Sequence, residues 1–414
     1  MSFADLDQKQ IENLLFFLDK ADQHELNKFK YKYAVKPGRN TMSFRENTLN
    51  NVMTGCIPFN EFMDWLSHIY LEGNNMLFVY EPKDINVFDH KSIDEVYSIA
   101  LKAKEHLYNI NVDNLDEIKL VNVWRDTPNQ QLIFTFASPA QVMVKEKDPE
   151  TGMSALVNKS DIYLSYFVMD YSLKHFVLMM HPTENLVSIL GEQKKKEWDD
   201  LIWILLRAFR LSVINFEINK PEWIFETLHA MTEEYFHHNN PVITEKINEF
   251  QEKLIRDITD QLVNSDTAFS KKTGHAARFS KSLLRTYENE LIVAYGPVQK
   301  ELDFEIFLHK SDKGTTEFKA NSRGKAFVFA ECADILRLMK ENGEIAALGI
   351  NYKLDDNGYK RAFPYLISIR DRYYSLRRTT TATTVKEVVD GVIRKLNNYK
   401  QEVQPSFTGI AENE

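Results

Sequence analysis

The stretch that decides the fold runs over residues 118–136, IKLVNVWRDTPNQQLIFTF. Its first half is rich in strand-forming residues, including Leu120 and Val123, and a second apolar run covers Leu132 to Phe136. Asp126-Thr-Pro-Asn129 stands between them, and these residue types favour a tight turn. Two such runs around a turn predict an antiparallel β-hairpin.

Strand signals continue beyond this hairpin at Val142–Val144, Tyr163–Met169 and His175–Met180. A helix precedes it, because Ser92-Ile-Asp-Glu95 has the spacing of a capping box and apolar residues follow at helical intervals. Residues 89–190 are therefore predicted to form an α+β domain with an antiparallel sheet of four to six strands and one helix on a face.

Helical patterns flank this domain on both sides. Residues 1–88 carry apolar residues at helical spacing and a second capping box, Ser43-Phe-Arg-Glu46, which predicts a small helical N-terminal domain. Residues 191–289 show helical stripes again, and the polar, basic stretch 265–281 is predicted to be a loop.

The last part, 290–400, is predicted to be a C-terminal α+β domain. Leu302–His309 and Glu317–Ala320 flank a turn, and Asn357-Gly358 is a strong hairpin signal. A third capping box, Thr384-Val-Lys-Glu387, opens a final helix, and 401–414 is predicted to be a flexible tail. The expected class is thus α+β and multidomain.

Composition excludes several kinds of chemistry. The 14 glycines include no P-loop spacing, no G-x-G-x-x-G and no G-x-S-x-G elbow. The two cysteines, Cys56 and Cys332, are too few for a Cys₄ zinc site or a disulfide framework. We therefore expect no resident cofactor and no metal unless a nuclease centre is present.

The sequence favours a cytoplasmic protein. Its first residues lack a basic and then apolar secretory pattern. The most apolar helical stretch, Leu201–Phe216, is 16 residues long and carries Arg207 and Arg210, so a membrane span is not expected. Two cysteines suit a reducing compartment.

Charge is distributed unevenly along the chain. With 60 acidic and 51 basic residues the net charge is −9, yet three stretches, 28–45, 271–285 and 360–378, together carry +16 and leave −25 for the rest. Such asymmetry indicates local recognition of an anion.

Two of these basic stretches are predicted to contact nucleic acid, because phosphates pair with Lys and Arg and because the last stretch interleaves arginines with aromatic residues. The predicted nucleic-acid-binding residues are Lys271, Lys272, Arg278, Lys281, Arg285, Arg370, Arg372, Arg377 and Arg378. The N-terminal stretch is predicted to meet a partner protein through Lys28, Lys30, Lys32, Lys36, Arg39 and Arg45.

One constellation suggests catalysis. Asp303, Glu317 and Lys319 fit the loose pattern of nucleases in which two carboxylates hold Mg²⁺ and a lysine orients water. Alternation along the second strand would place Glu317 and Lys319 on one face.

Three functions stay open at this stage. The first is an intracellular binding protein that contacts nucleic acid through basic patches and a partner protein through its helical N-terminal domain. The second is a metal-dependent nuclease of a bacterial defence or DNA-processing system, centred on Asp303, Glu317 and Lys319. The third is a structural subunit of an assembly.

Overall fold

The chain folds into two compact units. The computed structural model describes residues 3–36, 40–147, 153–183, 185–196, 198–266, 269, 274–298, 300–312, 317–322, 344–356, 359–380 and 385–403. Unit 1 comprises Met1–Pro221 and Arg370–Arg394, and unit 2 comprises Glu222–Ile369 and Lys395–Glu414. Both combine helices with antiparallel strands, so the predicted α+β, multidomain class is confirmed.

Unit 1 is built on an antiparallel sheet with the strand order β13-β1-β5-β4-β3-β6-β7, in which β2 also pairs with β3 and β8 with β1. Its strands are β1 (Met76–Pro82), β2 (Lys119–Asp126), β3 (Gln131–Lys147), β4 (Ser154–Asp170), β5 (His175–Met180), β6 (Leu186–Ile189), β7 (Glu192–Gln193), β8 (Ile218–Asn219) and β13 (Tyr374–Arg378).

The predicted hairpin over residues 118–136 is confirmed as β2 and β3. Asp126 lies opposite Gln131, and the Asp126 carboxylate accepts a hydrogen bond from the Asn129 amide at 3.3 Å. The strand predicted at Val142–Val144 is instead the continuation of β3, which pairs with β4 over 17 residues. The end of β3 and the start of β4 are largely exposed to solvent. Polar and apolar residues alternate there although neither face of this part of the hairpin is buried.

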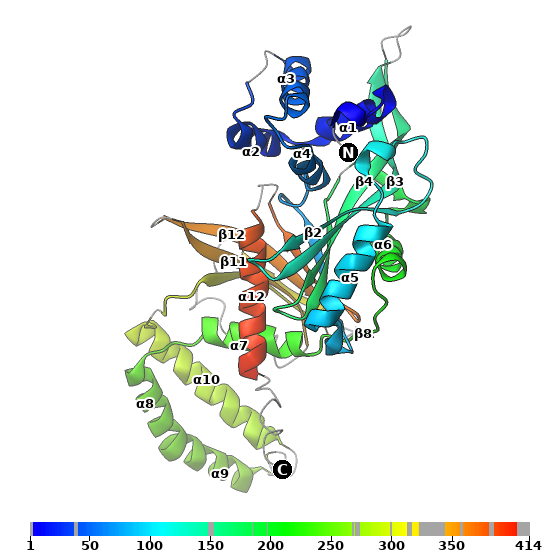
Figure 1. The fold of residues 1–414 in the computed structure, drawn as a ribbon. Coiled ribbons are helices and arrows are strands. Elements are labelled where there is room, and N and C mark those ends of the chain that lie inside the picture. Colours follow the sequence, from blue (N-terminus) through cyan, green and yellow to red (C-terminus); the bar gives the residue numbers. More distant parts are fainter. Residues whose placement is uncertain are drawn as a thin grey trace. The chain divides into compact units, whose positions relative to one another are not determined.

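The helices of unit 1 cover both faces of this sheet (Figure 1). They are α1 (Gln8–Lys20), α2 (Gln23–Tyr33), α3 (Thr41–Met53), α4 (Phe59–Ser67), α5 (His90–Ala103), α6 (Asp199–Ser212) and the first half of α12 (Lys386–Val403). Helices α5 and α6 share one core with the sheet, in which the rings of Phe167 and Phe209 stack at 4.3 Å.

Two of the predicted helix starts are displaced. Helix α3 is capped by Asn40, whose side chain accepts from the Ser43 amide at 2.9 Å, so Ser43 lies within the first turn rather than before it. Helix α5 begins at His90, which places Ser92 inside it. In both cases an Asn or Asp three residues earlier takes the cap position. The Asn40 side chain accepts a hydrogen bond from its helix, whereas Asp89 occupies the position without a side-chain hydrogen bond to α5. Thr384 lies outside the described residues.

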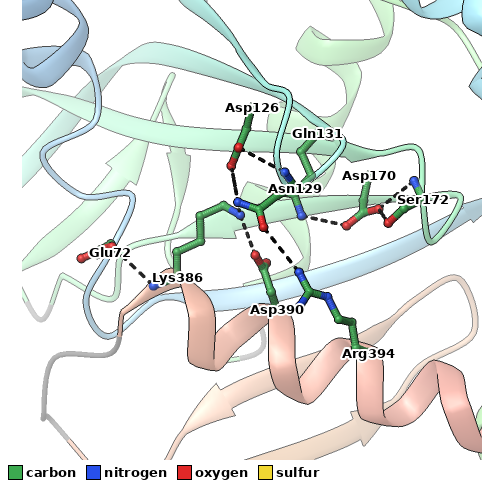
Figure 2. Close-up of polar contacts among 9 residues, drawn as sticks. All are labelled: Glu72, Asp126, Asn129, Gln131, Asp170, Ser172, Lys386, Asp390 and Arg394. Carbon is green, nitrogen blue, oxygen red and sulfur yellow. Dashed lines mark hydrogen bonds and ion pairs between the residues drawn. The ribbon is translucent and has the colours of Figure 1, made fainter. Parts of the chain in front are cut away.

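A nearly buried polar network holds the start of α12 against the sheet (Figure 2). The Lys386 ammonium lies 2.6 Å from Asp390 and 3.6 Å from Asp126. Beside it, the Gln131 amide donates to Asp170 at 2.7 Å. Asp170 also accepts from the backbone amides of the following turn, which explains the sharp reversal between β4 and β5.

Unit 2 combines a four-stranded antiparallel sheet, in the order β10-β9-β11-β12, with helices. Both predicted hairpins are confirmed by the pairing of β9 with β10 and of β11 with β12. The elements are α7 (Trp223–Tyr235), α8 (Pro241–Phe250), a π-helical turn (Gln251–Ile255), α9 (Arg256–Ser265), α10 (His275–Tyr295), β9 (Phe304–Asp312), β10 (Glu317–Asn321), β11 (Glu344–Asp356), β12 (Tyr359–Ile369) and the second half of α12.

Among the described helices, none combines the length and the apolar character that crossing a membrane requires. The Leu201–Phe216 stretch corresponds to α6 and the residues after it.

Candidate nucleic-acid interface

The N-terminal basic stretch is largely neutralised within unit 1. Lys28 pairs with Glu72, Lys32 lies 3.1 Å from Glu61, and Arg45 pairs with Asp19. Of the remaining predicted partner-binding residues, Lys30 lies over the Phe44 ring at 4.7 Å, Lys36 is exposed, and Arg39 is outside the described residues. Much of this charge therefore stabilises α2 against its neighbouring helices.

A small acidic group adjoins this stretch. Side-chain atoms of His24, Glu25 and Glu72 that could ligate a metal lie within 4.8 Å of one another. Burial raises the pKa of Glu25, against the opposing influence of Lys28. Because the Lys28 ammonium pairs with both carboxylates, it already supplies the positive charge at this position. We assign no metal here.

The second basic stretch belongs to unit 2 and is more regular than predicted. Helix α10 begins at His275, so only the first part of the predicted loop 265–281 precedes it, and Lys271 and Lys272 lie outside the described residues. The spacing of Arg278, Lys281 and Arg285 places them on one face of α10. Arg278 contacts the His275 ring nitrogen at 2.8 Å.

The third basic stretch does not offer the aromatic faces predicted for it. Phe363, Tyr365, Tyr373 and Tyr374 are buried, because they are the inward residues of their strands and of the turn between them. Tyr359 has no described side chain. Stacking on nucleobases therefore requires a ring from elsewhere.

The arginines of this stretch differ in exposure. Arg370, Arg372 and Arg377 are exposed, whereas Arg378 is buried and its guanidinium donates to Thr380 at 2.9 Å. Arg378 therefore offers little exposed surface for a polyanion to contact. On β13 the odd-numbered residue Arg377 points away from the face that buries Arg378, as strand alternation requires.

An exposed aromatic ring, Trp203, lies on α6. Trp203 is 44% exposed, and the Arg372 guanidinium lies over its ring, 5.5 Å from the ring centroid. The helix buries Leu205 and Phe209 against the sheet, which leaves Trp203, Arg207, Arg210 and Leu211 along the opposite side at spacings of four, seven and eight residues.

This stripe of α6, together with Arg372, is here termed the α6 surface. Its acidic neighbours are partly engaged, since Asp199 accepts from the Tyr373 hydroxyl at 2.7 Å and Asp200 pairs with Lys195 at 2.5 Å. Arg207 has no ion pair with a described residue. Asp371 is exposed beside Arg372 and is the one acidic residue of its stretch.

Sequence reasoning did not identify Trp203 or the role of its neighbours. The signal was present, because the buried stripe of α6 leaves a second stripe facing solvent, and that stripe holds a tryptophan and two arginines. Large aromatic residues usually pack in the core, so residue type alone does not predict an exposed tryptophan here.

The residues of the predicted nuclease centre do not converge. Asp303 precedes β9 and pairs with Lys395 at 2.8 Å, whereas Glu317 lies opposite Asp312 at the other end of that strand. Nine residues of strand separate the two carboxylates by about 30 Å. Glu317 and Lys319 do share a face of β10, but Glu317 pairs with Lys310 at 2.9 Å. A single Mg²⁺ cannot be held by Asp303 and Glu317 in this arrangement.

Comparison of the sequence with family models and with curated proteins finds no match.

Proposed function

We propose that the protein binds single-stranded nucleic acid through the α6 surface. The observation that carries this proposal is the exposed Trp203 ring beneath the Arg372 guanidinium, in line with Arg207 along the helix. A nucleobase can stack on an indole ring or on a guanidinium plane. Every base has a flat face that can do so, so such stacking does not depend on the nucleotide sequence.

The distribution of charge favours binding of a short single strand over binding of a long duplex. The protein as a whole is acidic, so only a local site can attract phosphates. Three arginines, Arg207, Arg210 and Arg372, lie on the α6 surface, which suits a contact with a few nucleotides.

The test is binding of a short fluorescein-labelled oligothymidylate, followed by anisotropy at low salt. We expect Trp203→Ala to weaken binding by about 1 to 3 kcal/mol, the usual contribution of one stacked base. Trp203→Phe keeps a ring and should retain part of the affinity.

The matched control is Arg45→Ala, which removes an arginine of unit 1 that is already paired with Asp19. Its affinity should equal that of the unaltered protein. The proposal fails if the oligonucleotide does not bind at low salt, or if Trp203→Ala and Arg45→Ala bind equally well.

A further inference from the structure

A second candidate site lies elsewhere in unit 1. A cavity of about 500 Å³ opens between α4, α5, β2 and the segment that follows α5. This volume is within the range of cavities that hold small molecules. The lining residues are Phe59, Asn60, Met63, Asp64, Tyr97, Leu101, Lys104, His106, Leu107, Tyr108 and Val121–Trp124.

Five of the residues that line this cavity carry aromatic rings. Phe59 and Tyr108 are stacked with their centroids 6.4 Å apart, and His106 stacks on Tyr108 at 4.9 Å. Trp124 is 38% exposed, and the Tyr97 ring is covered on one side by the Arg125 guanidinium at 4.6 Å. Such walls favour a flat aromatic ligand.

The Asp64 carboxylate, which lines the cavity, is held in position by Asn122. The Asn122 amide nitrogen donates to Ser67 Oγ at 2.6 Å and to Asp64 Oδ1 at 3.2 Å, so both of its hydrogens are engaged. The pairing of β2 with β3 shifts register between Leu120 and Asn122, and such irregularities redirect side chains.

The other oxygen of this carboxylate, Oδ2, accepts no hydrogen bond from a described residue, and Asp64 is exposed to the cavity. It is therefore an acceptor available to donors on a ligand.

Lys104, which follows α5, also lines the cavity and contributes a positive charge. Lys104 has no ion pair with a described residue, because the neighbouring Glu105 pairs with Lys119 at 3.0 Å. His106 lies two residues after Lys104, and burial and the charge of Lys104 lower its pKa. An anionic group of a ligand is favoured beside Lys104.

We propose that this cavity binds a guanine nucleotide. Guanine presents two adjacent donors, its ring N–H and its exocyclic amino group. Asp64 Oδ2 can accept one of them, and Oδ1 can accept the other through the lone pair that the Asn122 amide does not use. Adenine offers one donor beside an acceptor nitrogen, which Asp64 would repel. The aromatic walls hold the purine, and Lys104 pairs with the phosphate. This site is independent of the α6 surface.

The experiment is isothermal titration calorimetry of the full chain with GMP, AMP and guanosine. We expect GMP to bind about 10- to 100-fold more tightly than AMP, the discrimination typical of one paired polar contact. Asp64→Asn should abolish this preference, because the amide replaces an acceptor with a donor.

Two further variants separate the roles within the cavity. Lys104→Ala should lower affinity for GMP and leave that for guanosine unchanged. Asp116→Asn, which alters an exposed aspartate outside the cavity, is the control and should behave as the unaltered protein. Thermal unfolding of each variant establishes that it is folded.

The assignment is overturned if GMP does not bind, if GMP and AMP bind equally, or if a folded Asp64→Asn variant keeps the preference. Trp203→Ala should bind GMP normally, so failure of the oligonucleotide test and failure of this one are distinguishable.

Discussion

The Lys386 ammonium lies 2.6 Å from the carboxylate of Asp390, one turn along α12, and both side chains are almost buried. It is also 3.6 Å from Asp126, which is buried at the end of β2 (Figure 2). One cation thus serves two carboxylates that water cannot fully reach. This arrangement fixes where α12 begins on the sheet of unit 1.

Removing that cation should be costly. We expect Lys386→Ala to lower the free energy of unfolding by about 3 to 5 kcal/mol, because it leaves buried carboxylates unpaired. Urea unfolding followed by circular dichroism measures the loss. Lys195→Ala, which breaks the exposed pair with Asp200, is the matched control and should cost about 0 to 1 kcal/mol. Equal losses for the two variants would show that the network does not hold α12.

Unit 2 should lose stability in mild acid through His309. This histidine is fully buried on β9, and burial together with the charge of His229 lowers its pKa to about 4. The unfolded chain, with a pKa near 6.5, takes up the proton first, so the stability is complete above pH 6.5 and declines as the pH falls towards 4.

The loss attributable to His309 is up to about 3 kcal/mol at the acid end of this range. Urea unfolding at a series of pH values measures it. His309→Gln removes the titrating group, so its stability should vary less over the same range, and an unchanged pH dependence would exclude His309 as the cause.

Close packing at Gly349 gives a third expectation. A Cβ atom on this residue of β11 would lie 2.7 Å from Leu308 Cβ and 2.8 Å from the Phe307 ring. We expect Gly349→Ala to destabilise the protein by about 1 to 3 kcal/mol, because the neighbouring strand must move. Ala346→Ser, at a half-buried position of the same strand, serves as the control. Thermal unfolding distinguishes them, and equal melting temperatures would contradict the expected clash.

Added salt should weaken oligonucleotide binding, and the dependence should be steeper the more phosphates the arginines contact. Three phosphate contacts to a single strand give a slope of about −2 in a plot of log affinity against log salt, between about 50 and 200 mM. Arg207→Ala should reduce the magnitude of that slope by about 0.7. A slope near zero would show that phosphates are not contacted.

Much of the fold could be predicted from sequence because its signals are local. The Asp126–Asn129 turn and the flanking runs identified β2 and β3, and the expected final helix is α12. The full length of β3 was missed because its outer half does not contribute to a core.

The candidate site was less accessible to prediction, since it depends on residues far apart in the chain. Arg372 was identified from its basic stretch, but its partner Trp203 comes from α6, and only the fold brings them together. The same limit applies to Asp303 and Glu317, whose spacing resembled a metal site although the register of β9 and β10 separates them.

Unit 1 is assembled from two pieces of chain, and this has a consequence for biosynthesis. Strand β13 pairs with β1 from Met76 to Val79, yet the ribosome makes the 148 residues Glu222–Ile369 before it reaches that strand. At ordinary elongation rates this delay is roughly 7 to 30 s. Until then Met76–Val79 of β1 lacks the strand that pairs with it. An unpaired strand edge can pair with another chain, so the nascent protein is open to aggregation during that interval and chaperone binding would protect it.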